Sequence, residues 1–261
     1  MYTRGDTDLQ GGTFFVQFYY IRHAQSENNL LWTRTGASVG RSADPDITDA
    51  GRRQAHLLAQ YLCRTDTSVE AQERDLQNVG GFGLTHLYSS LMIRAVATGT
   101  IVARELGLPL VAWQDTHEWG GLYLRDEETD EPVGLPGPNR AYFEAHYPDL
   151  VLPDSLGEAG WWNRPFEERE ERTTRARRFL QELLERHDHT EDRVALISHG
   201  GFYNHVLEAL LDLPDRERFW FTMHNGAISR IDFDDQDPDD VERIGLIYTN
   251  RVEHLPAELI T

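Results

Sequence analysis

The sequence predicts an α/β fold, a three-layer sandwich in which helices flank a mostly parallel central sheet of roughly six strands. The run from Phe14 to Ile21 is almost all aromatic or β-branched, which is typical of a strand buried on both faces. Similar apolar runs alternate along the chain with segments of helical periodicity, and this alternation implies right-handed crossovers between parallel strands. With 261 residues and 39% hydrophobic content the chain can bury one large core. We therefore expect a single domain over residues 1–261.

Four buried strands make up the predicted parallel core. They are expected at Phe14–Ile21, Thr85–Tyr88, Leu110–Trp113 and Arg193–Ser198. Two later segments, Ala227–Phe233 and Arg243–Tyr248, alternate apolar and polar residues as edge strands do, and the acidic run DDQDPDD joins them as a solvated turn.

The first helices are predicted from their end signals. Thr48 is a suitable N-cap for a helix from about Asp49 to Arg64. Ser89 and Ser90 can cap the next helix, which Gly107 and the proline that follows bring to an end.

The later helices are predicted from apolar spacing. A short helix is expected near Asn139–His146 and a long one from about Pro165 to His187. Three Glu–Arg pairs at i,i+4 support the long helix: Glu168 with Arg172, Glu171 with Arg175 and Glu182 with Arg186. A last helix opens at His199-Gly200-Gly201, with Val206, Leu207, Leu210 and Leu211 on its apolar side.

Three stretches show weak patterning. Asn28 to Ala43 is predicted to be a loop, and residues 65–83 a polar surface excursion with room for one short helix. The stretch at about 120–162 is rich in Gly, Pro and acidic residues, and we interpret it as a functional lid because so long an irregular segment is otherwise unusual in a compact domain.

Net charge, cysteine content and the absence of long apolar runs restrict the class of protein. A net charge of −19 repels phosphate backbones and anionic lipid, so binding to nucleic acid or to a membrane surface is not expected. Cys63 is the single cysteine, which excludes an internal disulfide. The N-terminus has no apolar signal region and no apolar run is long enough to cross a bilayer, so a cytoplasmic location is the default expectation. The sequence does not indicate an oligomeric state.

Chemistry-bearing residues follow the buried strands, where parallel strands share one edge of the sheet. These residues are Arg22-His23, Ser89 to Arg94, Asp115 to Glu118, and His199-Gly200. Transfer of a phosphoryl group spreads negative charge over its oxygens, which arginines and a helix N-terminus with two glycines can stabilise. We expect a phosphoryl-transfer site at this edge, with no bound metal or other cofactor.

His23 is the candidate nucleophile, because a neutral imidazole can attack phosphorus and form a phosphohistidine. Glu118 is expected to protonate the departing alkoxide and later to deprotonate water. Arg22 and Arg94 offer bidentate donors, and His199, if cationic, would be a third positive contact.

These residues resemble a known family. RHAQSENN is similar to the RHG-x-[ST]-x-x-N signature of the histidine phosphatase superfamily, also called phosphoglycerate mutase-like. Ala24 stands where glycine is usual, and Gln25 where glutamate or glutamine is usual. ITDAGRRQA, SSLMIRAVATG, HEWGGLY and SHGG resemble the family's further blocks, in order, over residues from about 14 to 233.

The resemblance implies the phosphoglycerate mutase-like fold and a small phosphorylated substrate. It also implies that His23 is phosphorylated, that Glu118 is the proton donor, and that Arg22, Arg94 and His199 bind the phosphoryl group. Gln25 and Asn29 are candidates for further phosphate contacts, with loop hydrogen bonding as the alternative.

Other residues are open to two interpretations. His224 and Asn225 either serve the site or form a tight turn before a strand. A set of lid residues either lines the substrate pocket or only packs: Trp119, Tyr123, Arg125, Trp161, Trp162 and Arg164. Asp115 is the alternative to Glu118 as the acid.

The leading functional prediction is a metal-independent phosphatase that hydrolyses phosphomonoesters. A phosphoglycerate mutase is the near alternative, but the mutases' W-x-D run is absent and WGGLY replaces their tyrosine-glycine pattern, which favours hydrolysis. A non-catalytic phospholigand-binding protein on the same fold is a second alternative. A metallohydrolase that uses His23, His199, His117 and Glu118 is a third, although the spacings fit no helical metal motif.

Overall fold

The computed structural model describes residues 15–66, 75–187, 190–213, 219–234 and 244–261. Its centre is a seven-stranded sheet in the order β6-β3-β2-β7-β1-β8-β9, with a separate two-stranded hairpin, β4-β5. The first five strands of that order run parallel. β8 pairs antiparallel with β1, and β9 pairs antiparallel with β8. The prediction of an α/β fold with a mostly parallel sheet is confirmed.

The strands of the main sheet are β1 (Phe15–Arg22), β2 (His86–Ser89), β3 (Leu110–Ala112), β6 (Leu150–Val151), β7 (Arg193–Ser198), β8 (Ile228–Asp234) and β9 (Ile244–Arg251). Hydrogen bonding in register pairs Phe18 with Val194 and Arg22 with Ser198, so β1 and β7 end together. Residues that follow these two strands therefore meet at one edge of the sheet.

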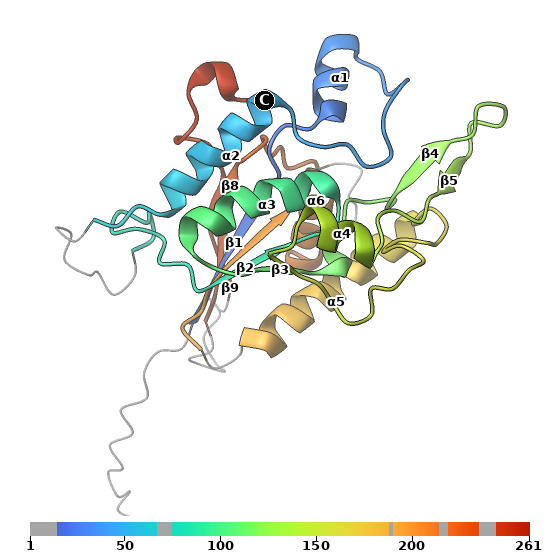
Figure 1. The fold of residues 1–261 in the computed structure, drawn as a ribbon. Coiled ribbons are helices and arrows are strands. Elements are labelled where there is room, and N and C mark those ends of the chain that lie inside the picture. Colours follow the sequence, from blue (N-terminus) through green and yellow to red (C-terminus); the bar gives the residue numbers. More distant parts are fainter. Residues whose placement is uncertain (1–14, 67–74, 188–189, 214–218, 235–243) are drawn as a thin grey trace, which may run out of the picture.

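Helices cover both faces of the sheet, as Figure 1 shows. The side chains of Tyr19 and Ile21 pack on one face with α2 (Asp49–Leu62) and α3 (Ile93–Leu106). Phe18 and Tyr20 point to the other face and pack with α5 (Arg169–His187) and α6 (Gly200–Leu210). This alternation along β1 explains why nearly all of its residues are apolar.

The predicted start of α2 and the predicted end of α3 are confirmed, but the predicted cap at the start of α3 is wrong. The Thr48 hydroxyl accepts the Gly51 N–H and begins α2, and Gly107, at φ 67°, ends α3. At the start of α3, however, neither predicted serine caps the helix. The Ile93 N–H donates instead to the Asp44 carboxylate at 3.0 Å, a partner from a distant loop.

The segment after His23, predicted to be a loop, contains a helix. Helix α1 (Glu27–Thr35) begins at Ser26, whose hydroxyl accepts the Asn29 N–H while the Asn29 side chain accepts the Ser26 N–H. None of its residues is buried, so the helix leaves no apolar periodicity in the sequence. Reciprocal capping of this kind stabilises the first turn without a buried face.

The long helix begins at Arg169, four residues later than predicted, because residues 165–168 are held by other contacts. The Glu167 N–H donates to the Gly120 carbonyl at 3.2 Å. The buried Arg175 forms an ion pair with Glu167 rather than with Glu171, whereas the predicted Glu182–Arg186 pair is present at 3.5 Å. At the end of α6, Leu211 is exposed and does not lie on the apolar side as expected.

The C-terminal strands differ from the expectation of two edge strands. β9 is an edge, but β8 lies between β1 and β9. Its polar residues misled the prediction, because Arg230 is fully buried and forms a two-armed ion pair with Asp232 at 2.7 and 2.9 Å. The acidic turn expected between the two strands lies almost wholly outside the described residues.

In residues 120–162 the helix predicted near Asn139–His146 is confirmed as α4 (Arg140–His146). This stretch also contains elements that were not predicted: the hairpin of β4 (Tyr123–Arg125) and β5 (Pro132–Gly134), and β6, which extends the main sheet. The hairpin projects from the body in Figure 1. In the excursion at 65–83, Asn78 and Phe82 are buried, and the place for a short helix lies outside the described residues. That the 120–162 segment acts as a lid stays a prediction.

Candidate active site

The backbone around His23 is fixed from three sides. Its N–H donates to the Ser198 carbonyl at 2.9 Å, and its carbonyl accepts the Asn225 side-chain amide at 3.0 Å and the Gly226 N–H at 3.3 Å. The Ala24 N–H donates to the Thr98 hydroxyl at 3.1 Å. These hydrogen bonds fix the backbone that carries the His23 imidazole, and the residue is only 3% exposed.

Hydrogen bonding defines the tautomer of His23. Its Nδ1 lies 2.7 Å from the Ala24 carbonyl, which can only accept, so Nδ1 carries the proton. Nε2 then holds the lone pair and accepts the Arg94 Nε–H at 3.1 Å. Burial, and then the charges of Arg94 and Arg22, hold the pKa of His23 well below its usual value. The ring is therefore neutral at neutral pH, with its lone pair on Nε2.

The charges of Arg22 and Arg94 act on this ring, and Arg94 contacts it directly. Arg22 donates from Nη1 to the Met223 carbonyl, while its buried Nε has no hydrogen-bond partner among the described residues. Burial lowers the pKa of Arg22 and of Arg94, and the charge of Glu118 opposes that effect in both.

His199 is the second histidine of the site. Its ring lies 5.1 Å from that of His23, centroid to centroid, and its Nε2 lies 2.6 Å from the Ser90 hydroxyl. Its Nδ1 is buried and has no partner in the part of the chain that the structure describes. Burial and neighbouring positive charge hold the pKa of His199 well below its ordinary value, so a cationic His199 requires the charge of a bound anion.

Glu118 is positioned by the first turn of α6. Its carboxylate accepts the Gly201 N–H at 3.1 Å and the Trp119 N–H at 2.9 Å. A Cβ on Gly201 would lie 2.0 Å from Trp119 Cδ1 and 2.3 Å from Glu118 Oε1. A side chain at position 201 would therefore displace Trp119 and the Glu118 carboxylate. At Gly200, the residue that the sequence singled out, the nearest atoms to a Cβ would belong to Arg22 at 3.4 Å.

A buried ion pair supports the segment that carries Glu118. Arg175 binds Glu167 through two nitrogens, at 2.5 and 2.9 Å, and donates to the carbonyls of Asp115 at 2.7 Å and His117 at 3.1 Å. Because both charged partners are buried and fully engaged, they fix the chain on either side of the carboxylate. Asp115, the alternative acid, is instead paired with the exposed Arg178 at 2.7 Å.

Gln25 and Asn29 are used in supporting hydrogen bonds. The Gln25 side-chain oxygen accepts the Thr48 hydroxyl at 2.8 Å, and the Asn29 side-chain oxygen accepts from Ser26 and from Asn225. Their phosphate contacts stay a prediction. The side chain of Ala24 packs in an apolar cluster with Ile47 and so accommodates the departure from glycine.

The lid residues divide into two groups. Trp161 and Trp162 are buried against His117, and Arg164 covers the Trp162 ring at 4.0 Å. Trp161 packs only, whereas Trp162 and Arg164 also line an open pocket together with Phe166. Arg125 pairs with Asp130 in the hairpin. Trp119 and Tyr123 remain candidates, and the guanidinium of Arg41, which the sequence did not single out, lies 4.5 Å over the Tyr123 ring.

Of the four residues of the metallohydrolase alternative, His117 is engaged in other contacts. His117 Nε2 lies 3.1 Å from an Arg164 nitrogen and His117 Nδ1 lies 2.8 Å from the Glu118 carbonyl. Over the described residues, the one group of three or more side chains arranged like metal ligands is a different one, His86, His187 and Asp192. His224 hydrogen-bonds to Asn250, whereas the Asn225 side-chain amide donates to the His23 carbonyl.

Sequence reasoning missed the supporting contacts of three residues. Ser90 binds His199, Asp44 lies 3.9 Å from Arg94 and caps α3, and the Gly201 N–H binds Glu118. Ser90 and Asp44 had no spacing signal, because their partners are distant in the sequence. Gly201 was visible as the second glycine of SHGG.

Proteins of known name resemble this chain over most of its length. Phosphoserine phosphatase 1 of Hydrogenobacter thermophilus is 26% identical over 227 residues, which cover 85% of this chain and 88% of the relative. A probable phosphoglycerate mutase, GpmB, of Yersinia pestis is 26% identical over 220 residues, covering 84% and 85%.

Two solved structures share the fold. A phosphoserine phosphatase of Entamoeba histolytica in complex with 3-phosphoglyceric acid matches with a TM-score of 0.55 at 19% identity, covering 92% of this chain and 100% of its own. A mycobacterial glucosyl-3-phosphoglycerate phosphatase matches with a TM-score of 0.56 at 18% identity and the same coverage. The family model of the histidine phosphatase superfamily (branch 1) matches residues 18–243, so the chain belongs to that superfamily.

Proposed function

We propose that this protein is a metal-independent phosphatase that hydrolyses a small phosphomonoester through a phosphohistidine on His23. The observation that carries the proposal is the state of that imidazole. Nδ1 donates to the Ala24 carbonyl, and Nε2 holds the lone pair and accepts the Arg94 Nε–H. A neutral nucleophile in contact with an always-charged guanidinium suits attack on an anionic phosphorus centre.

In the first step, the Nε2 lone pair forms a bond to phosphorus and the bond from phosphorus to the ester oxygen breaks. The electron pair of that bond leaves with the ester oxygen, which takes a proton from Glu118. Arg22, Arg94 and the N–H groups that begin α6 stabilise the charge on the phosphoryl oxygens. The unpartnered Nε of Arg22 and Nδ1 of His199 are buried polar atoms that a phosphoryl oxygen can satisfy.

In the second step, water attacks phosphorus while Glu118 takes its proton. The bond from phosphorus to Nε2 breaks and the lone pair returns to His23, which releases inorganic phosphate and restores the enzyme. Glu118 thus acts as acid and then as base, from a position defined by two backbone N–H groups.

The substrate class follows from charge and from the relatives. A chain of net charge −19 binds an anion through the local group of Arg22, Arg94 and Arg41 rather than through its surface. Relatives named for phosphoserine and glucosyl-3-phosphoglycerate support a small phosphorylated metabolite. A cytoplasmic location belongs to the same proposal. Over the described residues, no helix has the length and apolar character needed to cross a membrane.

The test is a panel of small phosphomonoesters assayed for phosphate release by the parent, by His23→Ala and by a matched variant of an exposed histidine, His146→Ala. We expect release by the parent and by His146→Ala in the presence of a chelator, and none by His23→Ala. Conversion of one phosphoglycerate to another without net phosphate release would identify a mutase. Binding of phosphomonoesters by parent and His23→Ala alike, without turnover in either, would identify a binding protein.

A further inference from the structure

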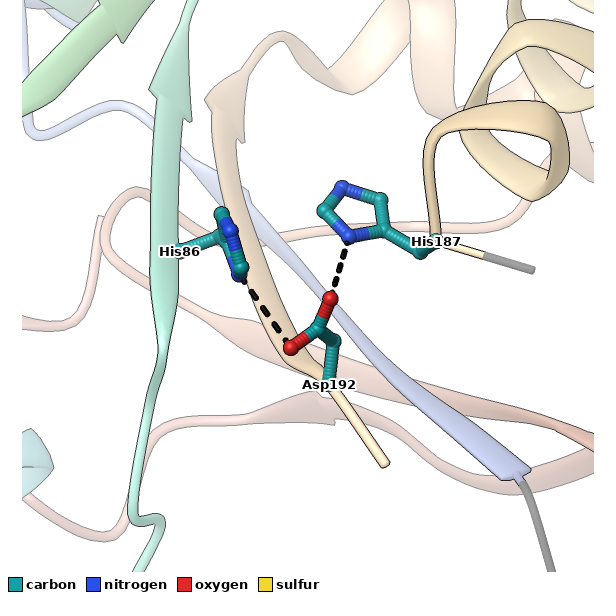
Figure 2. A group of neighbouring side chains, drawn as sticks. All are labelled: His86, His187 and Asp192. Carbon is teal, nitrogen blue, oxygen red and sulfur yellow. Dashed lines mark hydrogen bonds and ion pairs between the residues drawn. The ribbon is translucent and has the colours of Figure 1, made fainter. Parts of the chain in front are cut away.

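A second cluster of histidines lies at the opposite end of the sheet from the candidate active site. Figure 2 shows it, with His86 at the start of β2, His187 at the end of α5 and Asp192 directly before β7. β2 carries Ser89 and then Ser90 toward the other edge, and three residues of a strand span about 10 Å. The cluster therefore takes no part in the phosphoryl-transfer site.

The three side chains converge on one point. In Figure 2 the Asp192 carboxylate lies between the two imidazoles and offers one oxygen to each. Asp192 Oδ2 is 2.9 Å from His187 Nδ1, and Asp192 Oδ1 is 3.6 Å from His86 Nδ1. The ring centroids of the two histidines are 4.7 Å apart at an interplanar angle of 70°.

These separations suit a tetrahedral metal ion. Bonds of about 2.0–2.1 Å from zinc to nitrogen or carboxylate oxygen place neighbouring ligand atoms about 3.3 Å apart. The two observed separations lie on either side of that value, and the candidate ligand atoms of all three residues lie within 4.8 Å of one another. An ion would replace two contacts of the ligand atoms, the one between His187 Nδ1 and Asp192 at 2.9 Å and the one between the Thr85 hydroxyl and His86 Nδ1 at 2.9 Å.

The surroundings provide the support that metal-bound histidines usually have. The hydroxyl of Tyr88 lies 3.2 Å from His187 Nε2, so it can accept the N–H of that nitrogen when Nδ1 is bound to metal. His187 is only 2% exposed, whereas the side chain of His86 is 43% exposed, which leaves an entry path for an ion and a position for water.

We propose that His86, His187 and Asp192 form a binding site for a divalent zinc-type ion, with water in the fourth position. Two imidazoles and one carboxylate are the donors such ions prefer. The bound ion would fasten the start of β2 to the end of α5 and the start of β7. This proposal is independent of the proposed phosphatase activity.

The test uses the untagged full-length chain, stripped with a chelator and titrated with ZnCl₂ by calorimetry. The variants are His86→Ala and Asp192→Asn, which keeps the size of the side chain, with the exposed His56→Ala as the matched control. Neither His86 nor the control is buried, so both variants are expected to fold, as circular dichroism without zinc would verify.

We expect one zinc ion per parent chain and per His56→Ala chain, with an affinity lower by roughly tenfold or more in the other two variants. At zinc about 100 times above the dissociation constant, the parent and the control should also gain about 5 °C in Tm. Failure of the parent to bind zinc would overturn the proposal and leave a hydrogen-bonded cluster only. Equal affinity in the parent, His86→Ala and Asp192→Asn would overturn it too, because the zinc would then be bound elsewhere.

Discussion

Replacement of Gly201 with alanine tests how Glu118 is positioned. The added Cβ would lie 2.0 Å from Trp119 Cδ1 and 2.3 Å from Glu118 Oε1. Carbon atoms in contact are normally about 3.5 Å or more apart, so Trp119 has to move by about 1.5 Å and Glu118 by about 1 Å. The hydrogen bond from the Gly201 N–H to the carboxylate is then lost or lengthened.

The expected magnitude follows from that displacement. A misplacement of about 1 Å in a catalytic group costs about 100-fold in rate, which corresponds to about 2.7 kcal/mol. Folding stability should change much less, because alanine in a helix gains about 0.5–1 kcal/mol over glycine and offsets part of the local strain. Gly201→Ala should therefore lower kcat about 100-fold while the chain remains folded.

The assay is steady-state phosphate release from the best substrate of the panel, with Tm measured in parallel. Gly200→Ala is the matched comparison, since it adds the same methyl group one residue earlier, keeps the backbone N–H, and meets Arg22 only at 3.4 Å. It should lose far less activity. If Gly201→Ala keeps kcat within about threefold of the parent, Glu118 does not act from the position described.

Three further predictions concern the supporting residues. Ser90→Ala removes the hydrogen bond to His199 and should lower kcat/KM about tenfold, whereas Ser90→Thr, which keeps the hydroxyl, should not; equal activity in both would contradict a role for this contact. Burial raises the pKa of Asp44 from 3.8 to about 7, so the folded chain keeps a proton that the unfolded chain has lost. The stability from that proton is complete below pH about 3.8 and is lost as pH rises to about 7, at about 1.4 kcal/mol per pH unit. Urea unfolding at several pH values should therefore show the parent losing stability relative to Asp44→Asn over this range, and a constant difference would be evidence against the raised pKa. Arg175→Met leaves the buried Glu167 without its partner and should cost about 3–5 kcal/mol, seen as a fall in Tm of about 10 °C, whereas Arg178→Met, which breaks a half-exposed pair, should cost less than about 1 kcal/mol; similar Tm values for the two would show that burial does not matter here.

The sheet and its covering helices were predictable because their signals are local. The apolar run of β1 and the RVALIS run of β7 indicate buried strands rather than helices or exposed strands. Thr48 and Gly107 mark helix ends by their own chemistry. Helix α1 was missed because none of its residues is buried. The position of β8 was misjudged because Arg230 and Asp232 are buried as an ion pair. In the sequence, charged residues at alternate positions of a strand look the same whether they pair with each other or face solvent.

The site was predictable to the extent that its residues follow strand ends. His23 and His199 come after β1 and β7, which are adjacent in the sheet, so sheet topology alone brings them together. The contacts that hold them were not predictable, because Asp44, Ser90 and Asn225 reach their partners only after the chain has folded. The protonation pattern of His23 likewise depends on a carbonyl 2.7 Å away, which no spacing rule encodes.

The hydrogen bond from Arg94 to His23 Nε2 has a consequence for selectivity. Arg94 donates to the same Nε2 electron pair that the proposed reaction needs. The imidazole therefore cannot attack until this hydrogen bond is broken. A dianionic phosphoryl group competes for that guanidinium, and its arrival frees the atom that attacks it. An uncharged electrophile does not attract the Arg94 guanidinium, so the hydrogen bond to Nε2 would stay in place. Such a compound would therefore react more slowly as well as bind more weakly.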